Sequence, residues 1–184
     1  LLINRSDSSE LNIVVQNEQV QTPLITKDQK NKIDQLVSIF ENGTPEIQYG
    51  YIENLKDGRG YTAGKIGFIS ANNELYRVVD LYTKHKGVNN LRIYLNRLKE
   101  LADQGSSSIK GLEGIEQAWR QNADDPAFRL AQDELADEIY YEPALDYAKQ
   151  LGIKYPLSIG FVYDTIIQHG DGDDPDGLRA LIDR

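Results

Sequence analysis

The stretch that decides the fold runs from residue 41 to residue 68 and reads ENGTPEIQYGYIENLKDGRGYTAGKIGF. Glycines recur through it, with isoleucine, tyrosine and phenylalanine between them, which is typical of short strands joined by tight turns. The segments before and after it have the apolar spacing of helices instead. We therefore expect a mainly α protein with a small β-rich insert at about residues 47–70.

A helix is predicted immediately before this insert. Thr26 is a residue type that caps helix N-termini, so the helix should begin at Lys27. Its apolar stripe is Ile33, Leu36, Val37 and Phe40. Gly43 and Pro45 should end it, because glycine closes helices and proline cannot continue one.

Further helices are predicted after the insert from the same apolar periodicity. They are expected over residues 74–82, 90–102, about 125–141, 143–151 and 156–168. The last is the most apolar, so we expect it to be the central helix. The run GSSS at residues 105–108 should form a loop.

The first 25 residues differ in composition from the rest of the chain. They are polar, rich in glutamine and asparagine and weakly patterned, so we expect an N-terminal arm, either flexible or added as a strand. The apolar opening is too short for a signal peptide, and no apolar run is long enough to cross a bilayer. Residues 26–184 are expected to form the folded domain.

The charge of the chain favours a cationic partner over nucleic acid. With 29 acidic and 20 basic residues among 184, the net charge is −9. Proteins bind nucleic-acid backbones mainly through lysine and arginine, so a nucleic-acid partner is not expected. A negative field attracts cationic substrates, but for the charge taken by itself, solubility is the better explanation. There is no cysteine, which excludes disulfides and thiolate chemistry.

Two motifs that suggest phosphate or metal binding fail on inspection. The segment at residues 57–65, DGRGYTAGK, lacks the first glycine of a phosphate loop and the hydroxyl residue that must follow the lysine. The acidic run at residues 171–177, DGDDPDG, has proline and aspartate at two positions that a calcium loop fixes otherwise. We expect neither a metal nor a cofactor.

Two carboxyl groups in the opening stretch have contrasting surroundings. Glu41 lies one helical turn beyond Val37, so partial burial should raise its pKa and keep it protonated. Asp57 precedes Gly-Arg-Gly, where Arg59 should keep it ionised. Glycoside hydrolysis requires such a pair. Spacing alone favours the plainer alternative, in which Glu41 is a solvated helix-end acid and Asp57 an ordinary turn residue.

Four segments together resemble a known family. The opening stretch is followed in order by NELYRVVDLYT, IYYEPALDYAKQLGI and FVYDTIIQHGDGDDP. These resemble the family 46 glycoside hydrolases, the chitosanases, over about residues 26–179. The resemblance implies a two-lobed lysozyme-like fold, with substrate in the cleft between the lobes. It also implies that residues 26–184 form a catalytic domain lacking the family's C-terminal helical segment, which supplies arginines beside the catalytic acid.

The resemblance also implies roles for particular residues. Glu41 matches the general acid, Asp57 the base that activates water, and Thr62 the residue that helps to hold this water. The positions that match sugar-binding residues are Tyr51, Arg59, Glu74, Tyr140 and His169. Asp164 matches an aspartate in the network that supports the acid.

The activity implied is endo-hydrolysis of the β-1,4 links of chitosan, or of glucosamine oligomers, with inversion at the anomeric carbon. The enzyme would be a secreted bacterial monomer, acting without a membrane partner, whose signal peptide is not part of the sequence. Two alternatives stay open. One is a non-catalytic amino-sugar-binding relative or inactive fragment; the other, suggested only by lysozyme-like architecture, is a muramidase.

Overall fold

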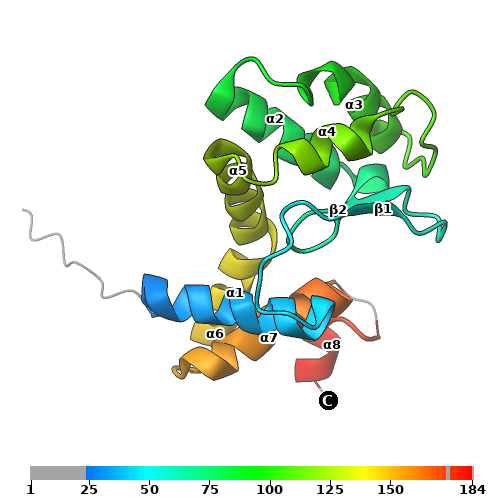
Figure 1. Ribbon diagram of the computed structural model, residues 1–184. Helices are drawn as coiled ribbons and strands as arrows, with labels where there is room; N and C mark the ends of the chain where they lie inside the picture. Colours follow the sequence, from blue (N-terminus) through cyan, green and yellow to red (C-terminus); the bar gives the residue numbers. More distant parts are fainter. Residues whose placement is uncertain (1–23, 173–174, 184) are drawn as a thin grey trace, which may run out of the picture.

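The computed structural model describes residues 24–172 and 175–183, which fold into two lobes with separate hydrophobic cores (Figure 1). One core is built from residues between 52 and 136, and the other from both ends of the described chain. We call them the upper and lower lobes, following Figure 1. The mainly helical, two-lobed prediction is confirmed.

The upper lobe contains the predicted β-rich insert and the helices that follow it. Its elements are β1 (Ile52–Asn54), β2 (Tyr61–Ala63), β3 (Phe68–Ile69), η1 (Ser70–Asn72), α2 (Glu74–Lys86), η2 (Arg92–Tyr94), α3 (Leu95–Asp103), α4 (Ile115–Gln121) and α5 (Pro126–Ala136). The strands form an antiparallel sheet in the order β1-β2-β3, with Thr62 of β2 opposite Glu53 on one side and Ile69 on the other. Thr62 therefore lies at the centre of the sheet.

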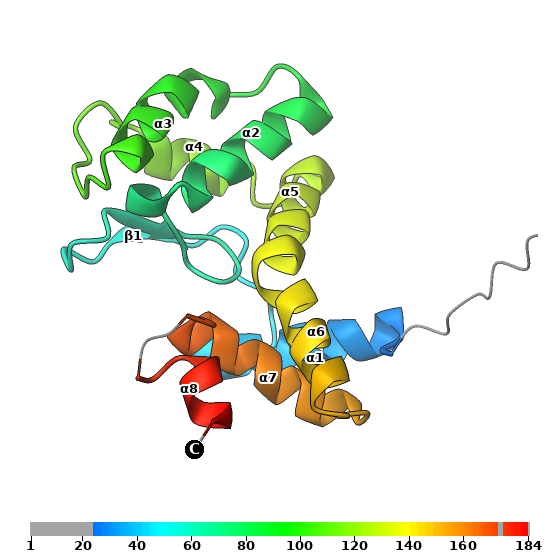
Figure 2. The ribbon, with the colours of Figure 1, turned by 180° about the vertical axis from the view of Figure 1, so that it is seen from behind.

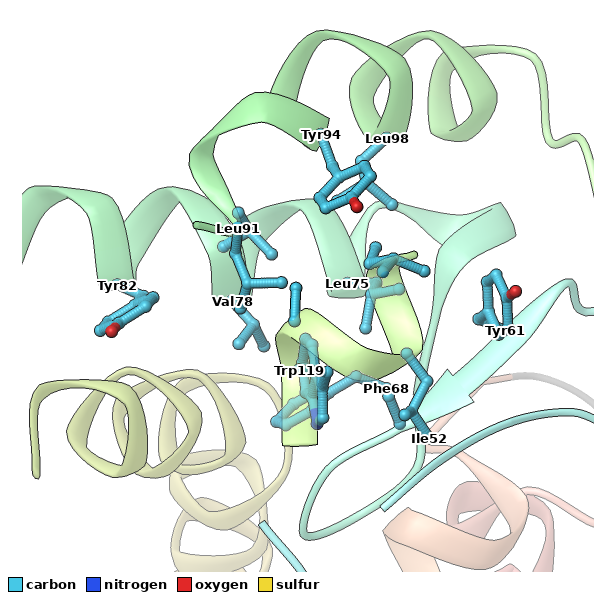
Figure 3. Packing of buried hydrophobic residues seen from close by; sticks show 14 of the residues in the cluster. Ile52, Tyr61, Phe68, Leu75, Val78, Tyr82, Leu91, Tyr94, Leu98 and Trp119 are labelled. Carbon is cyan, nitrogen blue, oxygen red and sulfur yellow. The ribbon is translucent and has the colours of Figure 1, made fainter. Parts of the chain in front are cut away.

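The upper core packs between the sheet and α2 to α5 (Figure 3). All four apolar positions predicted for α2 are fully buried: Leu75, Val78, Val79 and Tyr82. Trp119 of α4 is also fully buried and meets the Phe128 ring edge-on, at a centroid distance of 4.7 Å. The sequence interpretation did not include α4.

The lower lobe joins the start of the described chain to its end. Its elements are α1 (Lys27–Asn42), η3 (Asp137–Tyr141), α6 (Glu142–Gln150), α7 (Pro156–His169) and α8 (Leu178–Ile182). As predicted from its apolar composition, α7 is central, since it packs on α1, α6, η3 and α8 (Figure 2). Of the expected N-terminal arm, Leu24 and Ile25 pack on this core, and the rest lies outside the described residues.

The predicted ends of α1 are confirmed. Thr26 caps the helix in a capping box with Gln29, and Gly43 closes it in the left-handed conformation with φ of 70°. Ile33 and Val37 are buried as expected, but the inclusion of Phe40 in the buried stripe was wrong, because that side chain is 53% exposed. Phe40 lies in the last turns of α1, beyond Val37 and Ser38, which are the last buried residues of that helix.

One helical path connects the lobes. The two helices expected at about residues 125–141 and 143–151 form a single segment in which the π-helical turn η3 separates α5 from α6. Pro143 lacks the N–H that the Ile139 carbonyl would accept in an α-helix, which accounts for the widened turn. The turn carries Tyr140, which lines the groove. Within the residues described, no helix is both long and apolar enough to cross a membrane.

Candidate active site

A groove of about 290 Å³ lies where the sheet of the upper lobe faces the ends of α1 and α7. Five of the predicted site residues line it: Glu41, Tyr51, Arg59, Thr62 and Tyr140. The others are not among the lining residues: Asp57, Glu74, Asp164 and His169. Each of these four nevertheless interacts with a lining residue directly or through one neighbour, as the following paragraphs describe.

Glu41 occupies the last turn of α1 and faces the groove from the lower lobe. Although the residue as a whole is exposed, partial burial of its carboxyl raises its pKa, and the negative charge of Asp164 raises it further. A carboxyl with a raised pKa keeps its proton at mildly acidic pH, as a general acid must. The direction predicted from the position of Glu41 beside Val37 is confirmed.

Asp57 lies in the β1–β2 loop of the opposite lobe and is held by Arg59. The Arg59 Nε and Nη2 atoms lie 2.8 and 2.5 Å from Asp57 Oδ2, and the Arg59 backbone N–H donates to Oδ1 at 3.1 Å. These hydrogen bonds lower the pKa of Asp57, chiefly through the Arg59 side chain, as the sequence suggested. The two carboxyls therefore have pKa values shifted in opposite directions. Glu41 lines the groove from the lower lobe, and Asp57 is bonded to the groove-lining Arg59 of the upper lobe.

Thr62 presents its hydroxyl from the middle strand. The residue is buried, and its Oγ1 atom has no hydrogen-bond partner among residues 24–172 and 175–183. A buried hydroxyl without a protein partner is available to bind a water or a substrate oxygen. Because Thr62 is in the middle strand of the sheet and lines the groove, a molecule bound to its hydroxyl would lie in the groove.

Glu74 and Tyr140 form a pair between α2 and η3. The Tyr140 hydroxyl donates to Glu74 Oε1 at 2.9 Å, while the Ile69 backbone N–H donates to Oε2 at 2.9 Å. Nearby, Tyr51 donates to Glu53 at 3.3 Å and lines the groove from the upper lobe. Of the expected sugar-binding residues, Tyr51 and Tyr140 thus line the groove, and Glu74 is bonded to two lining residues, Tyr140 and Ile69.

The last two predicted residues belong to α7. Burial raises the pKa of Asp164, while His169 acts in the opposite direction, and one carboxylate oxygen of Asp164 is buried without a hydrogen-bond partner in the part of the chain described. Asp164 acts electrostatically on Glu41. His169 is exposed at the end of α7, and its neighbour Gln168 lines the groove in its place.

Sequence reasoning missed several groove residues. They are Asn42, Leu55, Gly64, Lys65, Ile66, Gly67, Ile69, Ile167 and Gln168. Four of them form the β2–β3 turn, which the sequence interpretation treated only as a rejected phosphate loop. Their place in the groove depends on how the two lobes pack, which local sequence patterns do not report.

No group of three or more acidic, histidine or cysteine side chains that could hold a metal occurs in the described part of the chain. The groove lining offers one carboxyl, hydroxyls, side-chain amides, one arginine and one lysine.

Two helical lobes, a small antiparallel sheet and a groove between the lobes that is lined by the Glu41 carboxyl define a lysozyme-like protein. The chain belongs to glycosyl hydrolase family 46, whose family model matches residues 35–184. The chitosanase of Bacillus subtilis (strain 168) is 50% identical over 160 residues, which cover 87% of this chain and 58% of that protein.

Solved structures share the fold as well as the sequence. A glutamate-to-alanine mutant of the chitosanase from Bacillus subtilis MY002, complexed with 6 GlcN, is 49% identical with a TM-score of 0.80. The GH46 chitosanase from Gynuella sunshinyii, in complex with chitotetraose, is 47% identical with a TM-score of 0.80. Each match covers 87% of this chain and 66% of the other chain, so this chain spans only part of its relatives' length.

Proposed function

We propose that this protein is an endo-acting chitosanase that hydrolyses the β-1,4-glycosidic bonds of chitosan with inversion at the anomeric carbon. Glu41 is the general acid, Asp57 the general base and Thr62 the residue that positions the attacking water. The observation that supports this most strongly is the pair of opposed pKa shifts, raised for Glu41, which lines the groove, and lowered for Asp57, which is bonded to the groove-lining Arg59.

Glu41 acts on the leaving group. Its proton passes to the glycosidic oxygen as the bond to the anomeric carbon breaks, which leaves Glu41 ionised beside an oxocarbenium-like sugar. Partial burial and Asp164 both disfavour the ionised form before reaction, so Glu41 stays protonated at mildly acidic pH and has a proton to donate when the leaving group needs it. After the reaction, solvent returns the proton.

Asp57 acts on water from the other side of the sugar. Its Oδ1 accepts the Arg59 backbone N–H, and a carboxylate oxygen can accept more than one hydrogen bond, so it can also accept from a water molecule. The Thr62 hydroxyl can accept or donate the second hydrogen bond to that water. Inversion needs carboxyls about 6.5–9.5 Å apart to leave room for the water, and residues on opposite lobes allow such a gap.

The substrate is proposed to be a cationic amino-sugar polymer. Glucosamine units carry ammonium groups at mildly acidic pH, and the chain carries a net charge of −9. The Glu74 carboxylate is bonded to Tyr140 and Ile69, both of which line the groove. We assign the sugar contacts to Tyr51, Arg59, Glu74 and Tyr140, with His169 at the margin of the groove.

The relatives support the same substrate class, since two of them are chitosanases solved with 6 GlcN and with chitotetraose. Chitosan is too large to enter cells, so the enzyme is proposed to be secreted, and to act as a monomer on glucosamine oligomers or chitosan chains.

The test follows the anomer formed first. Proton NMR of a glucosamine oligomer at early times should show the α-anomer as first product, because the β-linked substrate inverts. Glu41→Gln and Asp57→Asn should each lower kcat by about 10²- to 10⁴-fold. The exposed Glu100→Gln, on α3, is the matched control and should keep full activity.

A first product of β configuration would refute inversion. Near-normal turnover of either carboxyl variant would refute the assigned roles. Binding of glucosamine oligomers with no cleavage by the unmodified chain would select a non-catalytic sugar-binding protein, and cleavage of peptidoglycan in place of chitosan would select a muramidase.

A further inference from the structure

A buried charged cluster lies at the groove, centred on the lining residue Lys65. Lys65 has a side chain only 3% exposed, although it is a lysine in a turn between two strands. Its Nζ lies 2.7 Å from Asp133 Oδ1 of α5 and 3.5 Å from Asp34 Oδ2 of α1. Burying an ammonium group destabilises a fold unless its charge is paired, so burial of Lys65 depends on Asp34 and Asp133 staying close to it.

The turn that carries Lys65 is also held through its backbone. The Lys65 N–H donates to Gln132 Oε1 at 3.1 Å, and Gln132 Nε2 donates to the Tyr49 carbonyl at 3.1 Å. The Tyr49 hydroxyl donates to Asp133 at 2.9 Å. We call Asp34, Tyr49, Lys65, Gln132 and Asp133 the Lys65 cluster. It joins the β2–β3 turn to α1, to α5 and to the segment between α1 and β1.

The lower-lobe side of the cluster is fixed in turn. Lys30 Nζ lies 2.9 Å from Asp34 and 2.8 Å from Asp137, and it sits over the Tyr141 ring at 4.4 Å from the centroid. Asp34 is thus held at a defined place on α1. Burial alone would lower the pKa of Lys65, but the carboxylates of Asp34 and Asp133 outweigh it and keep the ammonium charged.

The cluster joins α1, which carries Glu41, to the turn that follows β2, which carries Thr62. Asp34 and Glu41 are both in α1, about two turns or 10 Å apart along a rigid helix, so a shift at Asp34 moves Glu41 with it. Lys65 follows Thr62 by three residues along β2 and its turn. Among the ion pairs of residues 24–172 and 175–183, Lys65–Asp34 is the one that joins α1 to the sheet.

We propose that Lys65 is a positioning residue, whose pairing with Asp34 and Asp133 sets the separation of Glu41 from the Asp57 and Thr62 side of the groove. This inference rests on the proposed function, because the distance across the groove matters to a reaction that uses both lobes. Lys65 itself does not touch the reacting atoms. A displacement of about 1 Å at such a site costs about 10²-fold in rate.

Two variants separate positioning from plain stability. Asp34→Asn removes the charge that pairs α1 with Lys65 of the β2–β3 turn, leaves Lys65–Asp133 in place and leaves Lys30 paired with Asp137. Lys65→Met/Asp133→Asn removes one charge of each sign from the cluster. The matched control is Lys99→Met/Asp103→Asn, an exposed pair within α3 with the same chemical changes.

The absence of cysteine allows the lobe separation to be measured directly. Spin labels at Val88→Cys in the upper lobe and Tyr155→Cys in the lower lobe occupy side chains that are 83% and 78% exposed. Pulsed electron paramagnetic resonance then gives the distribution of distances between the lobes. Kinetics on a glucosamine hexamer give kcat and KM separately.

We expect both cluster variants to lower kcat by about 10- to 100-fold, with KM changed less than threefold, and to broaden the distance distribution. The control pair should change neither. An unchanged distribution, or an unchanged kcat in a variant whose distribution broadens, overturns the proposal. If Lys65→Met/Asp133→Asn does not fold, Asp34→Asn decides by the same criteria.

The two proposals fail in different ways. If the unmodified chain does not cleave the hexamer, the proposed function fails, and the distance distributions alone decide whether the Lys65 cluster positions the lobes.

Discussion

Tyr140 donates a hydrogen bond to Glu74 at 2.9 Å and so ties the π turn that connects the lobes to the first residue of α2. Burial raises the pKa of Tyr140, and the Glu74 carboxylate raises it further, so the phenol stays a neutral donor. The Ile69 N–H holds the other oxygen of Glu74. Two residues that the sequence suggested as separate sugar contacts therefore act as one unit.

If the Glu74 carboxylate binds the substrate and Tyr140 only orients it, substitutions of the two residues should change KM by different amounts. Glu74→Gln removes the negative charge and should raise KM for glucosamine oligomers about tenfold, since a hydrogen bond to a charged group contributes about 1.5–3 kcal/mol. Tyr140→Phe keeps the charge and the Ile69 bond, so its KM should rise less. Michaelis kinetics at low and high salt provide the measurement, with salt sensitivity reduced only in Glu74→Gln.

Tyr94→Phe is the control for the second substitution, because the Tyr94 hydroxyl donates to the Glu113 carbonyl away from the groove. A rise in KM as large in Tyr94→Phe as in Tyr140→Phe would contradict the assignment.

Arg59 should set the acidic limb of the pH–rate profile. Its hydrogen bonds hold the pKa of Asp57 below the usual value, so Asp57 is ionised down to a lower pH than a free aspartate. Arg59→Gln removes this effect, and the pKa of Asp57 rises. Because the base must be ionised, the acidic limb of kcat/KM should move to higher pH while the alkaline limb stays in place.

The measurement is kcat/KM for a glucosamine oligomer from acidic to neutral pH, with the exposed Arg92→Gln as control. An acidic limb that does not move in Arg59→Gln would mean that Asp57 is not the group that titrates there.

Local features of this fold were readable from sequence, and long-range pairings were not. The cap at Thr26, the end at Gly43 and the buried face of α2 follow from residues near one another in the chain. Glu74 and Tyr140 are 66 residues apart, and Lys65 and Asp133 are 68 apart. Periodicity reports which face of an element is apolar but not which element covers it.

The same limit applies to the candidate site. The contrast between Glu41 and Asp57 was visible because Val37 and Arg59 are close in sequence. The influence of Asp164 on Glu41 depends on how α7 packs beside α1, and the burial of Lys65 depends on α1 and α5 together. Resemblance to a family supplied Asp164, whereas no local pattern marked Lys65.

Asp164 should set the alkaline limb. Its negative charge raises the pKa of Glu41, after burial the second cause of that shift. Asp164→Asn removes the charge, so the pKa of Glu41 falls and Glu41 loses its proton at lower pH. Because the acid must be protonated, the alkaline limb of kcat/KM should move to lower pH. The burial that raises the pKa of Asp164 itself restricts this effect to pH values at which Asp164 is ionised.

Asp146→Asn, an exposed change on α6, should leave both limbs unchanged. A shift of the alkaline limb toward higher pH in Asp164→Asn would contradict the proposed electrostatic coupling.

Trp119 should carry much of the stability of the upper lobe through packing. Its Nε1 donates to the Tyr49 carbonyl at 2.9 Å, but Gln132 donates to the same oxygen at 3.1 Å, so Trp119→Phe leaves no unsatisfied carbonyl. We expect Trp119→Phe to cost about 1 kcal/mol in free energy of unfolding and Trp119→Ala about 3–5 kcal/mol. Urea unfolding followed by circular dichroism measures both, with the exposed Ile93→Ala, 76% accessible, expected within about 0.5 kcal/mol of the unmodified chain. Equal losses in the two Trp119 variants would assign the stability to the hydrogen bond on the interlobe connection, and not to the ring packed against Phe128.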